Sequence, residues 1–253
     1  MGPQPAEKRA PAVNDAPYDA LEPRFVLWLE KNPGGTYAQY QTSRELISLG
    51  KGKDHATLGK KLRKYPDNWW DAGIEGFARL KRMSKLKPDD RVVDYGCGSL
   101  RIGGHFIRFL DPERYFGVDV TDGFYEMGKD LIGPEMVAEK RPRFAVIGDA
   151  SVAAAAAFAP DIVYSTAVSY HVHPSETPVY YGNLQRIAAK PGARLFFDVS
   201  ISDVPLRNKS WCWPLDFYVK SLPELEFVRM DGGVYRPEGA NFSMGMLEFR
   251  RAA

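Results

Sequence analysis

The feature that most constrains the fold is an alternation of short apolar runs with longer segments from Arg91 onward. Five of these runs are RVVDY, RYFGVDV, RFAVI, DIVYS and ARLFFDVS. Their length and their content of β-branched and aromatic residues are typical of buried strands. The segments between them are long enough for crossover helices. The pattern predicts an α/β fold, a doubly wound and mostly parallel sheet with helices on both faces.

Two more apolar runs, LEFVRM and SMGMLEFRR, come after a loop with the triplet WCW. A Gly- and Pro-bearing connection separates them, so we expect a hairpin-type pair at one edge of the sheet. The complete sheet would then have seven strands in a Rossmann-like arrangement.

The chain before the first strand has a different pattern. Residues 1–17 are rich in Pro and Ala and poor in large apolar groups, which predicts a disordered tail. Residues 18–86 show helical spacing, for example in RFVLWLEK and in the segment Thr36 to Gly50. We therefore divide the chain into the tail, a helical extension over 18–86 and a core domain over 87–253.

The stretch VVDYGCGSLRIGG, Val92 to Gly104, carries the first functional signal. It predicts a strand, a turn at Gly96 and Gly98, and a helix through Leu110 with Ser99 as its N-cap. Glycines let a backbone approach a ligand, and a helix N-terminus offers free N–H groups. A tight turn without a ligand would have the same pattern.

Spacing narrows the possible cofactors. A dinucleotide fingerprint would need glycine at position 101, where the chain has Arg101, and no Gly-Lys-Ser/Thr follows as in a phosphate-binding P-loop. Asp94 suits a cationic ammonium, or it orders the loop by hydrogen bonds. Asp119 and Asp149 end the next two strands, where they could hold ribose hydroxyls and an adenine amino group.

Together these motifs resemble those of the class I S-adenosylmethionine-dependent methyltransferases, over residues 91–249. VVDYGCGS resembles the glycine motif, GVDV the ribose acid, GDAS the adenine contact and PDIVYSTAVSYHV the fourth strand with its loop. One departure is Leu100, where many members have a third glycine. The resemblance implies S-adenosylmethionine as cofactor, S-adenosylhomocysteine as product, and these cofactor contacts: Asp94, Gly96, Gly98, Asp119, Asp149, Ala150, Ser165 and Thr166.

Methyl transfer is an in-line displacement, in which alignment supplies about 7–11 kcal/mol and a general base about 10²–10⁴-fold. His171 in SYHVHPSE is the candidate proton acceptor for a hydroxyl or amine; alternatively, it orients the next helix. The aromatic residues of the extension and the WCW loop would enclose a small-molecule acceptor or simply pack. They are Tyr37, Tyr40, Trp69, Trp70, Trp211 and Trp213.

Other functions remain open. Residues 51–87 contain eleven Lys or Arg against four Asp or Glu, which would suit a nucleic-acid methyltransferase. However, the net charge is only +2, and the Asn-Pro-Pro-Tyr signature of base methylases is absent after the fourth strand. Nucleic acid is therefore disfavoured as a partner. A protein methyltransferase and a protein that binds the cofactor without transferring methyl are further alternatives, and Arg101 disfavours an NAD-linked oxidoreductase.

Location and metal content follow from a few residue types. The chain has only two cysteines, no apolar segment typical of a signal peptide and no run of about 18 apolar residues. We therefore predict a cytoplasmic protein without a membrane anchor. His171 and His173 have no acid cluster nearby, so we predict no metal site. The sequence does not indicate an oligomeric state.

Overall fold

The computed structural model describes residues 22–50, 70–71, 73–207, 211–235 and 242–252. The predicted tail, Trp69 and most of the basic stretch after residue 50 lie outside these ranges. All seven predicted strands lie inside them.

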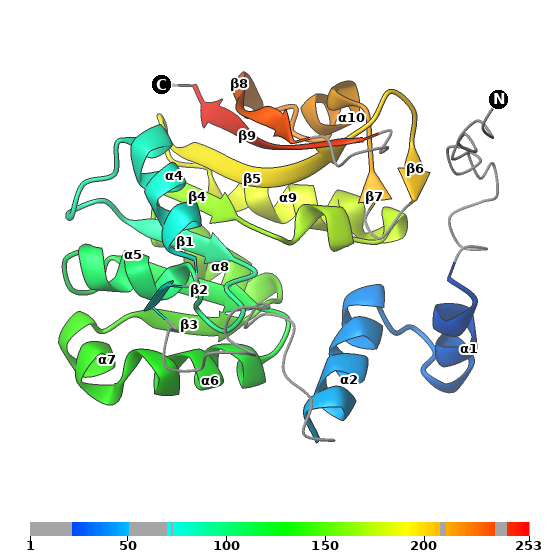
Figure 1. Ribbon diagram of the computed structural model, residues 1–253, viewed down its shortest axis with the longest axis horizontal. Helices are drawn as coiled ribbons and strands as arrows, with labels where there is room; N and C mark the ends of the chain where they lie inside the picture. The colour runs from blue at the N-terminus through cyan, green and yellow to red at the C-terminus, as the bar shows by residue number, and fades with distance from the viewer. Residues whose placement is uncertain (1–21, 51–69, 72, 208–210, 236–241, 253) are drawn as a thin grey trace, which may run out of the picture.

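A single seven-stranded sheet forms the centre of the molecule, in the order β3-β2-β1-β4-β5-β9-β8 (Figure 1). The first five strands are parallel, and β9 runs antiparallel between β5 and β8. The predicted edge pair and the α/β class are therefore confirmed. The strands of this sheet are β1 (Val92–Tyr95), β2 (Tyr115–Asp119), β3 (Arg143–Val146), β4 (Ile162–Ser165), β5 (Arg194–Ile201), β8 (Leu225–Tyr235) and β9 (Ser243–Arg251).

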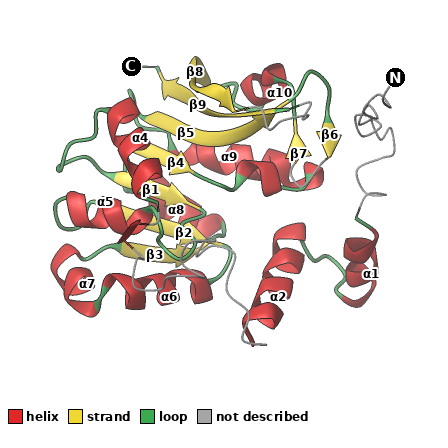
Figure 2. Ribbon diagram, viewed as in Figure 1, coloured by secondary structure: helices red, strands yellow, loops and turns green. Residues whose placement is uncertain are grey.

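Helices cover both faces of the sheet, as Figure 2 shows. One face packs against α4 (Ile74–Ser84), α5 (Gly103–Phe109), α6 (Asp122–Ile132) and α7 (Pro134–Lys140). The other packs against α8 (Asp149–Ala157), α9 (Thr177–Ile187) and α10 (Leu215–Lys220). Because both faces are covered, every residue of β1, β2 and β4 is buried, which explains their continuous apolar sequences.

The N-terminal helices are α1 (Pro23–Lys31) and α2 (Tyr37–Gly50). They form a small aromatic cluster of their own, with Phe25 as its centre. Short elements follow β4 and β5. These are the 3₁₀ helices η4 (Ser169–His171) and η5 (Pro174–Glu176) and the two-stranded pair β6 (Leu206–Arg207) and β7 (Trp211–Cys212).

The last helix of the predicted extension packs on the sheet. Leu80 and Met83 of α4, with Leu86 after it, are buried against β1 residues such as Val92. The boundary between extension and core at residues 86 and 87 stays a prediction, and any deletion through α4 would uncover one face of the sheet.

One local prediction was wrong. Ser99 does not cap the helix after β1, because α5 begins at Gly103 and its N-cap is Ile102. The chain first turns through Leu100, whose φ of 58° is left-handed, and this turn delays the helix.

Candidate active site

The loop after β1 is the centre of the site. Gly96 and Gly98 have φ of 85° and 53°, in the region that glycine enters without strain. A Cβ on Gly96 would lie 2.4 Å from Cγ2 of Val168, in the loop after β4. The glycine is therefore required both by its backbone angle and by the close approach of the β1 and β4 loops.

Asp119, the last residue of β2, supports this loop directly. Its Oδ2 accepts a hydrogen bond from the Gly98 N–H at 2.7 Å, and Oδ1 accepts one from the Val120 N–H at 2.8 Å. The side chain is buried, and desolvation raises its pKa to about 6, although the backbone N–H groups lower it. Since a carboxylate oxygen accepts more than one hydrogen bond, Asp119 can brace the loop and still accept from ribose hydroxyls.

Asp94 faces the inside of the protein. Its Oδ2 accepts hydrogen bonds from the hydroxyls of Tyr115 at 2.6 Å and Tyr164 at 2.7 Å. Burial raises its pKa to about 7, against the lowering effect of these two bonds. These bonds join β1 to β2 and β4, and the two predicted roles of Asp94, contact with an ammonium group and ordering of the glycine loop, stay predictions.

Ser165, at the end of β4, is also engaged within the protein. Its hydroxyl donates to the carbonyl oxygen of Tyr95 at 2.7 Å and accepts from the Tyr180 hydroxyl at 2.8 Å. The residue is fully buried. Its side chain therefore ties β1 to β4 and α9.

The third predicted acid is exposed. Asp149 begins α8 and lies 3.5 Å from Arg186 in an ion pair. Ala150 is also exposed, and Thr166 is partly exposed. No atom lies within 4 Å of the position that a Cβ on Gly148 would take, so the chain before Asp149 is open on that side.

Leu100 shows how the chain accommodates its departure from the family pattern. Its φ of 58° is the conformation that glycine favours, so the loop keeps a left-handed residue without having a glycine there. The side chain is fully buried and lies against Gly128 of α6. Burial of this leucine offsets a backbone strain of about 1–2 kcal/mol.

The two histidines after β4 have different environments. His171 is exposed on η4, with its ring 4.6 Å from that of Tyr170. His173 is buried, and its ring packs against Phe25, Tyr37 and Trp211 at 5.4, 4.9 and 5.4 Å. The predicted proton acceptor therefore faces solvent, while its neighbour joins the N-terminal helices to the WCW loop.

Four of the aromatic residues predicted to enclose the acceptor are buried in this structure, namely Tyr37, Tyr40, Trp211 and Trp213, whereas Trp70 is partly exposed. Tyr37 and Tyr40 pack with Phe25, and Trp213 stacks on Phe217 at 4.2 Å. Trp211 is fully buried. The structure brings Tyr37 and Trp211 together around His173, and a direct acceptor contact for the four residues stays a prediction.

Glu176 fixes the N-terminal helices to this side of the core. Its carboxylate accepts hydrogen bonds from the backbone N–H groups of Tyr37 and Ala38, the first residues of α2. Desolvation raises its pKa, and the two N–H groups lower it. A carboxylate at a helix N-terminus also interacts favourably with the helix dipole.

Sequence reasoning missed Asp198, which lies in β5 beyond its last pair with β4. Its Oδ2 accepts from the Ala167 N–H at 3.3 Å, and desolvation raises its pKa to about 6, against the electrostatic effect of Arg79 and Arg101. The pKa of Tyr170 is raised to about 12, mainly by burial and secondly by the negative charge of Asp198. The rule that ligands bind at carboxyl ends of parallel strands could have identified it in ARLFFDVS.

The described residues offer neither a metal-binding cluster nor a membrane-spanning helix. They contain no group of three or more His, Cys, Asp or Glu placed to hold a metal ion. None of the described helices combines the length and apolar character that a bilayer-spanning helix needs.

The sequence matches no protein-family model and no curated protein. Solved structures are similar in fold. The [4+2]-cyclase SpnF has a TM-score of 0.57 at 13% identity, over 71% of this chain and 81% of that chain. The magnesium protoporphyrin IX methyltransferase ChlM from Synechocystis PCC 6803, solved with bound SAM, has a TM-score of 0.52 at 16% identity, over 94% and 100%.

A third similar structure is the Haemonchus contortus phosphoethanolamine N-methyltransferase 2, in complex with phosphomonomethylethanolamine and S-adenosylhomocysteine. Its TM-score is 0.53 at 14% identity, over 71% of this chain and 52% of that chain. At these identities the likeness concerns the fold. The protein has the fold of the class I S-adenosylmethionine-dependent methyltransferases, as the sequence motifs predict.

Proposed function

We propose that the protein is an S-adenosylmethionine-dependent methyltransferase that methylates a hydroxyl or amine of a small molecule. The observation that carries the proposal is the bond between Asp119 and Gly98. It places an acid at the end of β2 against a loop with two left-handed glycines. ChlM, which shares the fold over the whole of its own chain, was solved with SAM bound.

The residues at this edge fit the cofactor. Asp119 would accept from the ribose hydroxyls, the loop of Gly96 and Gly98 would border the methionine part, and Asp149 with Ala150 borders the open side of α8. The buried hydroxyl of Ser99 has no hydrogen-bond partner among the described residues, which leaves one polar atom of the loop available. Ser165 and Thr166 lie where β4 ends at the same edge of the sheet. Asp94 joins β1 to β4 there through its bond with Tyr164.

The cofactor supplies an electrophilic methyl group on a sulfonium, and the chain supplies alignment and exclusion of water. His171, on the loop after β4, is the proposed proton acceptor. Asp198 is an alternative: with a pKa of about 6, its carboxyl is mostly ionised at neutral pH and able to take a proton. Because a base contributes less than alignment, losing either group should slow turnover without abolishing cofactor binding.

The acceptor is proposed to lie between the carboxyl ends of β4 and β5, the N-terminal helices and the WCW loop. Support comes from contacts that already join these parts, those of Tyr37 and Trp211 with His173. ChlM and the Haemonchus contortus enzyme are similar structures whose names specify small-molecule acceptors.

Calorimetric titration with S-adenosylmethionine, S-adenosylhomocysteine and NAD tests the cofactor. We expect the first two to bind and NAD not to bind. Asp119→Asn should weaken binding about 10- to 100-fold, the value of hydrogen bonds to a charged group. Asp122→Asn, which changes the same charge on the exposed start of α6, is the matched control. Binding of NAD alone would contradict the proposal.

Transfer of a tritiated methyl group into fractionated cell extract tests the acceptor. Label in the small-molecule fraction supports the proposal, and label confined to RNA, DNA or protein would replace it with one of the macromolecular alternatives.

A second candidate function is binding of the cofactor without methyl transfer. SpnF favours it, because a protein named as a [4+2]-cyclase shares this fold. Tight S-adenosylmethionine binding with no label in any fraction would support this alternative.

A further inference from the structure

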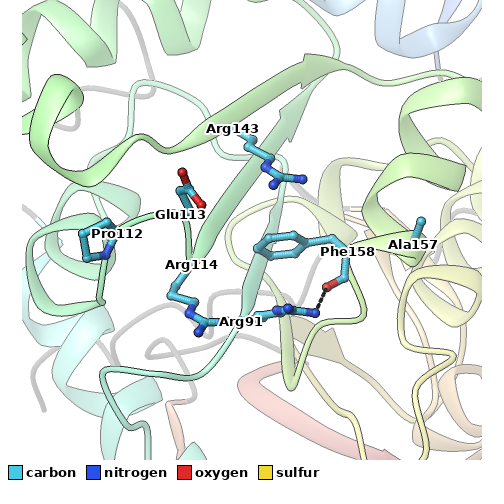
Figure 3. A pocket seen from close by; sticks show the side chains of 7 residues that line it. All are labelled: Arg91, Pro112, Glu113, Arg114, Arg143, Ala157 and Phe158. Atoms are coloured by element: carbon cyan, nitrogen blue, oxygen red, sulfur yellow. Dashed lines mark hydrogen bonds between the residues drawn. The ribbon is translucent and has the colours of Figure 1, made fainter.

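A cavity of about 400 Å³ opens at the amino-terminal edge of the sheet, opposite the candidate active site. Figure 3 shows three arginine side chains gathered around the ring of Phe158. The lining residues are Arg91, Pro112, Glu113, Arg114, Arg143, Ala157 and Phe158. None of them belongs to the candidate active site.

Strand register explains why the three arginines meet. Arg91 precedes β1, Arg114 precedes β2, and Arg143 begins β3. Val92 pairs with Tyr115, and Phe116 pairs with Arg143. Because side chains alternate between faces, all three arginines lie on the α8 face, on neighbouring strands about 4.8 Å apart.

The positive charge of this cluster is poorly balanced within the protein. Among the described residues, none of the three guanidinium groups forms an ion pair with a carboxylate. Glu113, the one acid in the lining, is paired with Arg141 at 3.0 Å, outside the cavity. Asp161 interacts electrostatically with Arg91 but is bonded to Lys190 and to the Arg91 backbone N–H.

Phe158 contacts two of the arginines and leaves most of their N–H donors without a hydrogen bond. The guanidinium carbons of Arg91 and Arg143 lie 5.8 and 5.3 Å from the centre of its ring. Arg91 also donates to the Phe158 carbonyl oxygen at 3.2 Å. A guanidinium has five N–H donors, so most donors in the cluster remain available to a ligand.

We propose that this cavity binds a small molecule with two or more phosphate groups. Guanidinium groups match phosphate oxygens in geometry and bind them by charge-assisted hydrogen bonds. A volume of about 400 Å³ lies in the range of small-molecule sites and exceeds the size of a single phosphate.

Calorimetric titration of the full chain with diphosphate, ADP and orthophosphate tests the proposal, with and without S-adenosylmethionine. We expect diphosphate and ADP to bind more tightly than orthophosphate, and added salt to weaken them. Arg114→Gln and Arg143→Gln should each lower diphosphate affinity about 10-fold or more. Arg250→Gln, an exposed arginine on β9, should change it less than 2-fold.

Thermal unfolding of each variant shows whether it is folded. We expect both variants to fold, because neither the Arg114 nor the Arg143 side chain forms a hydrogen bond or an ion pair with a described residue, and their backbone bonds in the sheet are unchanged. Three results would overturn the proposal. The first is equal diphosphate affinity in the double variant Arg114→Gln/Arg143→Gln and the wild type. The second is competition of diphosphate with S-adenosylmethionine. The third is binding of a 12-nucleotide RNA far more tightly than diphosphate, which would indicate a nucleic-acid surface.

Discussion

Substitution of Gly96 by alanine tests the geometry of the loop after β1 most directly. The new methyl group would lie 2.4 Å from Cγ2 of Val168, where a normal contact between carbon atoms is about 3.5–4.0 Å. Val168 must then move by about 1 Å or more, an overpacking that typically costs about 1–3 kcal/mol. The φ of 85° adds about 1–2 kcal/mol for a residue with a Cβ.

We therefore expect Gly96→Ala to lower the free energy of unfolding by about 2–5 kcal/mol. A typical domain has a free energy of unfolding of about 5–15 kcal/mol, so a loss of about 2 kcal/mol would leave the variant folded. Urea unfolding followed by circular dichroism measures the change. Cofactor affinity should fall at least about 10-fold, because the β1 and β4 loops both shift.

A double-mutant cycle with Val168→Ala separates the two causes. Removing Cγ2 should relieve the clash and leave the φ strain, giving a coupling of about 1–3 kcal/mol between the two sites. Gly148→Ala is the matched control, because its φ is −177° and its Cβ would have no neighbour within 4 Å. Gly96→Ala with wild-type stability, or no coupling to Val168, would refute this account of the loop.

Four further changes probe other parts of the site. In urea unfolding, Leu100→Gly should be about 1 kcal/mol more stable than Leu100→Ala, because both variants lose the buried side chain but only glycine relieves the strain of the left-handed backbone. Equal stability of the two variants would contradict that strain. Asp119→Asn should also lower the free energy of unfolding by about 1–3 kcal/mol, because its amide NH₂ faces a backbone N–H; unchanged stability would mean that the brace on Gly98 is weak. Burial raises the pKa of Asp94 to about 7, so the protonated carboxyl contributes fully to the free energy of unfolding below its ordinary pKa of 3.8, and this contribution is lost as pH rises through about 7. Asp94→Asn should remove this loss from a plot of the free energy of unfolding against pH. Parallel plots for the variant and the wild type would contradict it. Glu176→Ala should speed hydrogen exchange in the first turn of α2 several-fold, while exchange in β1 stays constant; protection equal to wild type would show that other contacts hold the helix.

The strands were predictable because their signal is local. Runs such as RVVDY and DIVYS contain strands that are buried on both faces and are therefore apolar at most positions, whereas RFAVI contains the edge strand β3, which is partly exposed. The start of α5 was not predictable from the same signal. Ser99 has the chemistry of an N-cap, but the left-handed conformation of Leu100 after it is stabilised by contact with α6, distant in the sequence.

The arrangement of the candidate cofactor edge was predictable for a similar reason, whereas the contacts of its residues with a cofactor stay a prediction. Loop glycines and acids at strand ends have recognisable spacing, and the topology of a parallel sheet brings strand ends together. The acceptor side has no such signal. The burial of His173 depends on packing against residues of α1, α2 and β7, which are distant from it in the sequence.

Register is the information that strand prediction lacks, and two features of this protein depend on it. Pairing of Val92 with Tyr115 and of Asp94 with Tyr164 brings both tyrosine hydroxyls to the Asp94 carboxylate. The pairing of Phe116 with Arg143 brings three arginines to one face at the opposite edge. A slip of one residue would move the whole set of side chains on a strand to the other face. The chemistry at both edges of the sheet is therefore fixed by how neighbouring strands align, although each strand is recognisable alone.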